Sequence, residues 1–227
     1  MKAFIVLLIA SFLKADVDNG VWISEEIKDP NCFYENDYNW LYIRAFTSTG
    51  MVDKSARQNL ISTKEAVPNR RIYVMPTVKV EAATMMKKVC EEVIQGLEEK
   101  FHVYVAVYSD PVNWFPDKAQ NRAYLEKILE SMKAQPDCFK TINIISRKFD
   151  WESVLGADYS EFSAHVLIWD KTSDKVCSRD GYIPFGGWKL PDGVVFNHLV
   201  DVCENKCDVS CLYMGLGVTE EGSKEED

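Results

Sequence analysis

The sequence has few basic residues, and beyond its first residues it has no long apolar segment. Lysine and arginine total 26 against 35 acidic residues among 227, which gives a formal net charge of −9. This deficit of positive charge disfavours nucleic acid as a partner, because affinity for nucleic acid depends on cationic contacts to phosphate. The same charge opposes adhesion to anionic cell walls and membranes. No segment outside the amino terminus is long and apolar enough to suggest a membrane span.

Motifs for several kinds of chemistry are also missing. No glycine-rich loop follows the first strand-like run, which weakens a nucleotide-binding interpretation. Gly-x-Ser-x-Gly is absent, and His102, His165 and His198 lie in no motif with a serine nucleophile, so structural roles are expected for them. No Asn-x-Ser/Thr sequon occurs, and N-glycans are therefore not expected. We expect no cofactor.

The amino-terminal residues have the composition of a secretory signal peptide. Lys2 gives a basic start, residues 4–12 are almost wholly apolar, and the small residue Ala15 precedes Asp16. The apolar run is too short to span a membrane. We therefore expect cleavage after residues 1–15, a domain over residues 16–218, and a secreted or lysosomal protein.

Cysteine is well represented in the rest of the chain. The seven cysteines are Cys32, Cys90, Cys138, Cys177, Cys203, Cys207 and Cys211. An oxidising compartment predicts at least two disulfides, and at most three with one thiol left over. Cys203, Cys207 and Cys211 recur every four residues, which raises zinc as an alternative. Such intervals do not form the paired knuckles of zinc sites, and no histidine follows them, so no metal is expected.

Strand-like and helix-like segments alternate along the chain without a linker. The predicted strands are residues 21–23, 40–46, 71–75, 103–108, 141–146, 166–169 and 194–196, with a weak last element at 214–218. The predicted helices are residues 53–67, 81–100 and 118–133. Residues 219–227 carry five acids and one lysine and predict a disordered tail. This order predicts a single α/β domain built as an irregular (β/α) TIM-like barrel, with an open doubly wound sheet as the alternative.

Short motifs stand at the ends of the predicted strands. Residues 20–24 read Gly-Val-Trp-Ile-Ser, residues 105–110 read Val-Ala-Val-Tyr-Ser-Asp, and residues 185–191 read Phe-Gly-Gly-Trp-Lys-Leu-Pro. In order and spacing, over nearly the whole mature chain, they resemble the family 25 glycoside hydrolases. These are the Chalaropsis-type lysozymes, and the resemblance is greatest to their secreted nematode and protozoan members. It implies a flattened α/β barrel that hydrolyses the β-1,4 bond between the amino sugars of peptidoglycan, at the carboxyl ends of its strands.

The resemblance places the family's catalytic carboxylates at Trp22, Tyr108 and Asp110. Glycoside hydrolysis normally needs two carboxyl groups. An indole has no acid function, and a phenol with a pKa of about 10 is a poor base near neutral pH. Asp110 keeps a carboxyl group but is one methylene shorter than the family's glutamate. Asp170, at the end of the predicted sixth strand, is a second candidate catalytic carboxylate. The alternative is a turn or helix-capping role for Asp170 and a turn role for Asp110.

Aromatic side chains near the loops after the strands could stack on sugar rings or pack in the core. The candidates for glycan binding are Trp114, Trp169, Tyr182 and Trp188. The favoured hypothesis is a catalytically degenerate lysozyme-like protein that binds bacterial cell-wall glycan, another carbohydrate or a protein partner, in innate immune defence. The alternative is an active glycosidase that cleaves peptidoglycan with Asp110 as the acid and Asp170 as its partner. A structural or signalling role without a sugar ligand is a third hypothesis.

Overall fold

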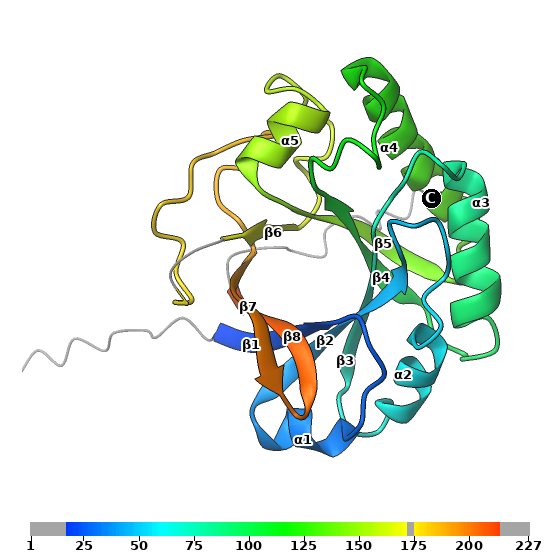
Figure 1. Cartoon of the computed structure of the whole chain (residues 1–227), viewed down its shortest axis with the longest axis vertical. Coiled ribbons are helices and arrows are strands. Elements are labelled where there is room, and N and C mark those ends of the chain that lie inside the picture. The colour runs from blue at the N-terminus through cyan, green and yellow to red at the C-terminus, as the bar shows by residue number, and fades with distance from the viewer. Residues whose placement is uncertain (1–16, 172–174, 214–227) are drawn as a thin grey trace, which may run out of the picture.

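The computed structural model describes residues 17–171 and 175–213, which form a closed barrel of eight strands (Figure 1). The strands are β1 (Val17–Ile23), β2 (Tyr38–Phe46), β3 (Asn69–Val74), β4 (Phe101–Val107), β5 (Phe139–Ser146), β6 (Leu167–Asp170), β7 (Gly193–Val202) and β8 (Asn205–Tyr213). Strands β1 to β7 pair in parallel in chain order. Strand β8 closes the barrel by running antiparallel to both β7 and β1. The predicted TIM-like barrel is confirmed, and its antiparallel closure is what makes it irregular.

The helices lie outside the barrel, between successive strands (Figure 1). They are α1 (Pro30–Glu35), α2 (Ala56–Ser62), α3 (Ala82–Lys88), α4 (Lys118–Lys133) and α5 (Lys148–Val154), and α3 continues into the π-helical turn η1 (Val89–Ile94). Helix α4 has the predicted bounds, and the Asp117 carboxylate caps it by accepting a bond from the Ala119 amide at 2.8 Å. The predicted helix 81–100 is wrong beyond Ile94, because Gly96 adopts a φ of +82° in the turn that follows.

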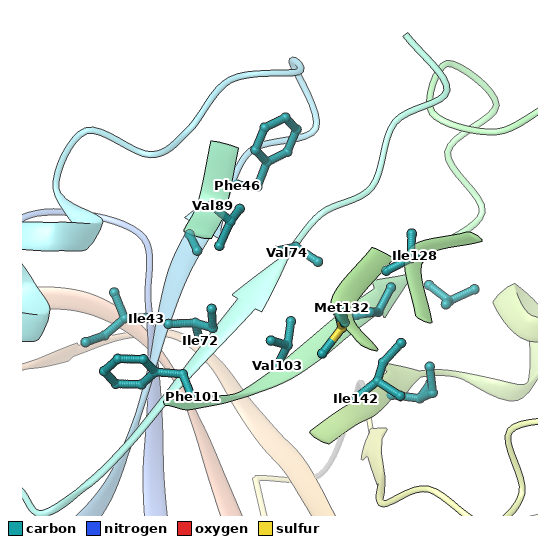
Figure 2. Close-up of a cluster of buried hydrophobic side chains, with 14 of the residues drawn as sticks. Ile43, Phe46, Ile72, Val74, Val89, Phe101, Val103, Ile128, Met132 and Ile142 are labelled. Atoms are coloured by element: carbon teal, nitrogen blue, oxygen red, sulfur yellow. The ribbon is translucent and has the colours of Figure 1, made fainter. Parts of the chain in front are cut away.

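The outer faces of the strands pack against these helices. Figure 2 shows this layer, in which side chains of β2 to β5 meet α4 and η1. Ile43, Ile72 and Val103 lie on neighbouring strands, and each is fully buried. Ile128 and Met132 of α4 occupy the stripe of apolar positions that the sequence predicted. Alternate residues of the same strands point into the barrel, where they support the site described below.

Three disulfides join parts of the chain that are distant in sequence. They link Cys32 to Cys203, Cys90 to Cys138, and Cys177 to Cys211. Cys207 is a buried free thiol. The prediction of at least two disulfides is therefore confirmed. No helix within residues 17–171 and 175–213 has the length and apolar character needed to cross a membrane.

Some predictions concern residues outside the described part of the chain. The expected signal peptide, residues 1–15, lies there, as do the weak element at 214–218 and the acidic tail at 219–227. Strand β8, by contrast, is described but was not predicted. Its inward-facing positions include Asp208 and Ser210, which alternate with the buried Cys207, Val209 and Cys211. This period-two pattern of a half-buried strand is present in the sequence and was overlooked.

Candidate functional site

The carboxyl ends of the parallel strands meet at one end of the barrel, which we call the mouth. Functional side chains of such barrels gather at this end. Tyr108 directly follows β4, Asp170 ends β6, and His198 lies in the second half of β7. Asp208 belongs to the antiparallel strand β8 and pairs with Trp22 of β1. Five strands thus bring polar or aromatic side chains to the mouth.

Trp22 fills the inside of the barrel at the first of the positions that the resemblance assigns to a carboxylate. Its ring stacks on Tyr42 with a centroid distance of 4.0 Å and an angle of 2° between the planes. Tyr73 and Tyr104 meet it edge-on at 5.3 and 5.6 Å. Trp22 is only 5% exposed. This packing makes Trp22 part of an aromatic core.

His198 lies between two carboxylates. Its Nε2 is 3.1 Å from Oδ1 of Asp170, and its Nδ1 is 3.5 Å from Oδ1 of Asp208. Two register shifts in β7, on either side of Asn197, displace this segment from regular pairing with β8. Leu199 next to it has a φ of +51°, and its amide donates to Asp208 at 2.9 Å. The irregular strand therefore directs the imidazole toward both acids.

The charge of His198 follows from these two neighbours. The Asp170 and Asp208 carboxylates raise the pKa of His198 from 6.5 to about 10, against the opposing effect of burial. The imidazole is consequently protonated at neutral pH and neutralises part of the negative charge at the mouth. Asp170 is 7% exposed and already paired, so it is not a free carboxylate.

Tyr108 stands at the second assigned position and is unsuited to acid–base chemistry. Burial, together with the charge and the hydrogen bond of Asp170, raises its pKa well above the usual value. The guanidinium of Arg147 lies 5.4 Å from the centre of its ring. Arg147 is itself paired with the buried carboxylate of Asp150. Asp150 also accepts bonds from the amide and hydroxyl of Ser109, which fixes the chain after β4.

Asp110, the third assigned position, lies in an exposed turn. Its carboxylate accepts a bond from the Val112 amide at 3.0 Å and another from Nδ2 of Asn113 at 3.1 Å. The Asn113 amide closes the same turn by donating to the Asp110 carbonyl at 3.0 Å. These bonds are those of a turn-forming aspartate, the alternative role considered for this residue.

The four aromatic candidates for glycan binding divide into two pairs. Trp114 and Trp188 are about as buried as core residues, at 5% and 4% exposed, and each donates its indole N–H to a backbone carbonyl. Trp169 and Tyr182 are partly exposed and pack edge-on at 5.4 Å. Lys171 lies 5.7 Å from the Trp169 ring. Any sugar contact through these residues therefore depends on Trp169 and Tyr182.

The family model for lysozyme-like protein 1 matches residues 13–194. This chain belongs to the lysozyme-like protein 1 family. The family 25 lysozyme type that the motifs suggested is thereby confirmed.

Curated relatives of this lysozyme-like chain extend over most of its length. It is 25% identical to lysozyme-like protein 5 of Caenorhabditis elegans over 213 residues, covering 91% of this chain and 95% of the relative. It is 24% identical to the probable GH family 25 lysozyme 2 of Dictyostelium discoideum, and the match covers 88% of this chain and 94% of that relative.

Solved structures show that the barrel is that of family 25 lysozymes. The Aspergillus fumigatus GH25 lysozyme has a TM-score of 0.72 at 15% identity and covers 88% of this chain and 96% of its own. The lysozyme of Streptomyces coelicolor has a TM-score of 0.70 at 12% identity, and the match covers 87% of this chain and 92% of that lysozyme. At these identities the likeness establishes the fold.

Two residues of this lysozyme-like site were missed by sequence reasoning. His198 was expected to be structural, and Asp208 was not considered because β8 itself was not predicted. The sequence signal for Asp208 is its place in the alternation of polar and apolar residues over 206–211, which predicts a strand. Pairing with Trp22 across β1 and β8 then places Asp208 at the mouth. The structure brings both residues together with Asp170, whereas Asp110 has turn partners instead.

Proposed function

We propose that this lysozyme-like protein binds a glycan or a protein partner at the mouth and does not hydrolyse peptidoglycan. The observation that carries this proposal is the packing of Trp22, whose ring occupies the position of a family carboxylate within an aromatic core. Hydrolysis needs one carboxyl group to protonate the leaving oxygen and another group to attack or to activate water. Neither Trp22 nor Tyr108 supplies such a group.

The remaining acids support the same conclusion. Asp170 and Asp208 share the His198 cation, and Asp110 is occupied by the bonds of its own turn. A general acid must reach the scissile oxygen within hydrogen-bond distance and must carry a proton near the working pH. Asp170 and Asp208 would have to give up their shared partner His198, and Asp110 its turn partners, before any of them could reach a scissile oxygen.

Glycan binding does not require the lost carboxylates. Trp169 and Tyr182 pack against the outer core next to the end of β6, and their exposed parts offer stacking surfaces beside the mouth. The paired acids at the mouth can accept bonds from sugar hydroxyls. The autolysin LytC of Streptococcus pneumoniae, which shares the fold, is described in complex with a synthetic peptidoglycan ligand. For this chain we propose the same class of ligand, together with secretion and a role in innate defence. The expected signal peptide and the three disulfides support secretion.

Purified mature protein tests the absence of hydrolysis. We expect no clearing of bacterial walls above a buffer control between about pH 4 and pH 8, because loss of a positioned acid or base costs about 10²–10⁴-fold in rate. Clearing that is lost in an Asp110→Asn variant would overturn the proposal and make Asp110 the general acid. A triple variant with Trp22→Asp, Tyr108→Asp and Asp110→Glu, checked for folding by circular dichroism, should gain activity over the wild type.

Sedimentation with insoluble peptidoglycan tests binding. We expect Trp169→Ala to weaken retention about tenfold, equivalent to ~1.4 kcal/mol, as for removal of an aromatic anchor. Tyr34→Ala is the matched control, because Tyr34 is an exposed aromatic residue on α1 and lies outside the mouth. Equal retention of the wild type and Trp169→Ala would contradict a glycan site at this position.

A further inference from the structure

The opposite end of the barrel, where β2 to β5 begin, carries a second group of polar side chains. Arg71 of β3, His102 of β4, and Lys140 and Thr141 of β5 form what we call the amino-end cluster, which lies beside Trp40 of β2. Ile72 pairs with Val103, so Arg71 and His102, one residue earlier in each strand, are neighbours on parallel strands. None of these residues belongs to the mouth.

Arg71 is held in place but not neutralised. Its guanidinium carbon lies 4.7 Å from the centre of the Trp40 ring, and the side chain is half-buried. Within the described residues it makes no ion pair, and its one side-chain bond is a 3.4 Å contact to the Arg70 carbonyl. A guanidinium has five N–H donors. Most of the donors of Arg71 are therefore available to a ligand.

Asp18 of β1, an acid close to Arg71 through Trp40, already has other hydrogen-bond partners. The carboxylate of Asp18 accepts the indole N–H of Trp40 at 3.1 Å and Nδ2 of Asn39 at 3.4 Å. It forms no ion pair with Arg71 in the described part of the chain. Asp18 thus holds Trp40, and Trp40 in turn supports the guanidinium of Arg71.

The charge around His102 is positive. Burial, the Arg71 guanidinium and the Lys140 ammonium lower the pKa of His102 to about 4. Its Nδ1 lies 2.7 Å from the Thr141 hydroxyl. Lys140 has no ion pair within residues 17–171 and 175–213. At neutral pH the cluster therefore presents two cations, a neutral imidazole and a hydroxyl.

We propose that the amino-end cluster is a binding site for an anionic oxygen group, a carboxylate or phosphate, held by Arg71. The planar fork of a guanidinium matches two oxygens of such a group, and stacking on Trp40 fixes its orientation in advance. Lys140 supplies a second positive charge, and Thr141 with His102 supplies neutral polar contacts. The site lies at the other end of the barrel from the mouth and is independent of the proposed glycan binding.

Two sources could supply this group. One is a small anion or the anionic group of another molecule in solution. The other is this chain itself, because β8 ends at Tyr213, which pairs with Val17 at the amino end of the barrel. The residues that follow in sequence include Glu220, Glu221, Glu225 and Glu226.

Titration of the full chain with inorganic phosphate and with acetate, at constant ionic strength, tests the site by NMR of His102. We expect saturable shifts of the His102 ring signals and an upward move of its pKa by about one unit, with tenfold tighter binding to the protonated form by reciprocity. The signals of His165 and His198 are internal controls and should not respond. If neither phosphate nor acetate produces saturable shifts of the His102 signals, the proposal is overturned.

Variants of the cluster test the role of Arg71. We expect Arg71→Gln to weaken anion binding at least about tenfold, as for loss of a charge-assisted bidentate contact, and Arg71→Lys to weaken it less. Lys79→Gln removes one exposed positive charge elsewhere and should leave affinity unchanged. Circular dichroism establishes that each variant folds. Equal affinity of wild type and folded Arg71→Gln would overturn the proposal.

A charge-neutral variant of the last residues distinguishes the two sources. It carries Glu220→Gln, Glu221→Gln, Glu225→Gln and Glu226→Gln in the full chain. If the chain's own carboxylates occupy the site, this variant binds phosphate more tightly than wild type. If an external anion is the ligand, both bind it equally. Either result supports an anion site, provided that Arg71→Gln weakens the binding at least about tenfold.

Discussion

His198 sets the balance of charge at the mouth of the barrel, and its effect on stability has a definite sign. Its pKa in the folded chain, about 10, exceeds the ordinary value of 6.5. Folding therefore favours the protonated imidazole. The resulting stabilisation is fully present below about pH 6.5 and disappears as the pH rises through about 10.

The variant His198→Gln tests this dependence. At pH 6 we expect a loss of about 2 kcal/mol in the free energy of unfolding, because removal of the cation leaves two carboxylates close together; the side chain is partly exposed, which reduces the effect. The loss should shrink above about pH 10, where the wild-type imidazole is neutral too. Urea unfolding of the wild type and the variant at several pH values measures the loss at pH 6 and its decrease at high pH.

His165→Gln is the control for that experiment. Burial lowers the pKa of His165, so folding favours its neutral imidazole. The stability that His165 contributes is therefore present above its ordinary pKa and declines as the pH falls, which is the opposite of the pH dependence expected for His198. A penalty for His198→Gln that is the same at pH 6 and above pH 10 would contradict the ion pair as its cause.

Trp22 is a structural residue in this chain, and its replacement should show this. Trp22→Ala removes a ring that contacts Tyr42, Tyr73 and Tyr104 and should cost about 3–5 kcal/mol, the range for large-to-small changes in a core. Trp22→Phe keeps part of the stack and should cost less. Thermal or urea unfolding compares the two variants, and a loss below about 1 kcal/mol for Trp22→Ala would contradict the packing described here.

At the scale of elements, the sequence predicts best the helices and strands whose buried face is regular along their whole length. Helix α4 has one apolar stripe and a capping aspartate, and both bounds were predicted correctly. Strand β4 is buried on both faces and appears as a continuous apolar run. Helices α1 and α5 were not predicted, because six or seven residues are too few to show a helical period.

The β7–β8 hairpin explains why the site was only partly predicted. Trp22, Tyr108 and Asp170 could be placed at the mouth because each ends a recognisable parallel strand. His198 and Asp208 lie where β7 changes register and where β8 alternates polar residues inward. Their proximity depends on the closure of the barrel, which joins residues at opposite ends of the sequence.

The disulfide Cys32–Cys203 ties this hairpin to helix α1 across 171 residues. A double variant, Cys32→Ser with Cys203→Ser, should lose about 5 kcal/mol, because a cross-link over a long loop restricts the unfolded chain most. The pair Cys177–Cys211 spans 34 residues and should contribute about 4 kcal/mol on the same basis. Unfolding of both double variants tests this order, and a larger loss for the shorter loop would contradict it.

At the scale of the whole molecule, the net charge of −9 affects its approach to bacterial walls. Walls rich in anionic polymers repel a negative protein, and salt screens that repulsion. We therefore expect retention on such walls to increase as ionic strength rises from about 0.01 M to about 0.15 M. A sedimentation assay measures it, with uncharged chitin as the control surface. Retention that falls with salt would show that a cationic patch dominates the encounter.

The antiparallel closure by β8 has a practical consequence for handling the molecule. Because Val17 pairs with Tyr213, the first and last described residues leave the barrel side by side, at the end remote from Asp170 and His198. A linker or affinity handle attached at either residue would anchor the barrel by its base. Immobilised in this way on a sensor chip, every molecule would present its mouth to the flowing sample.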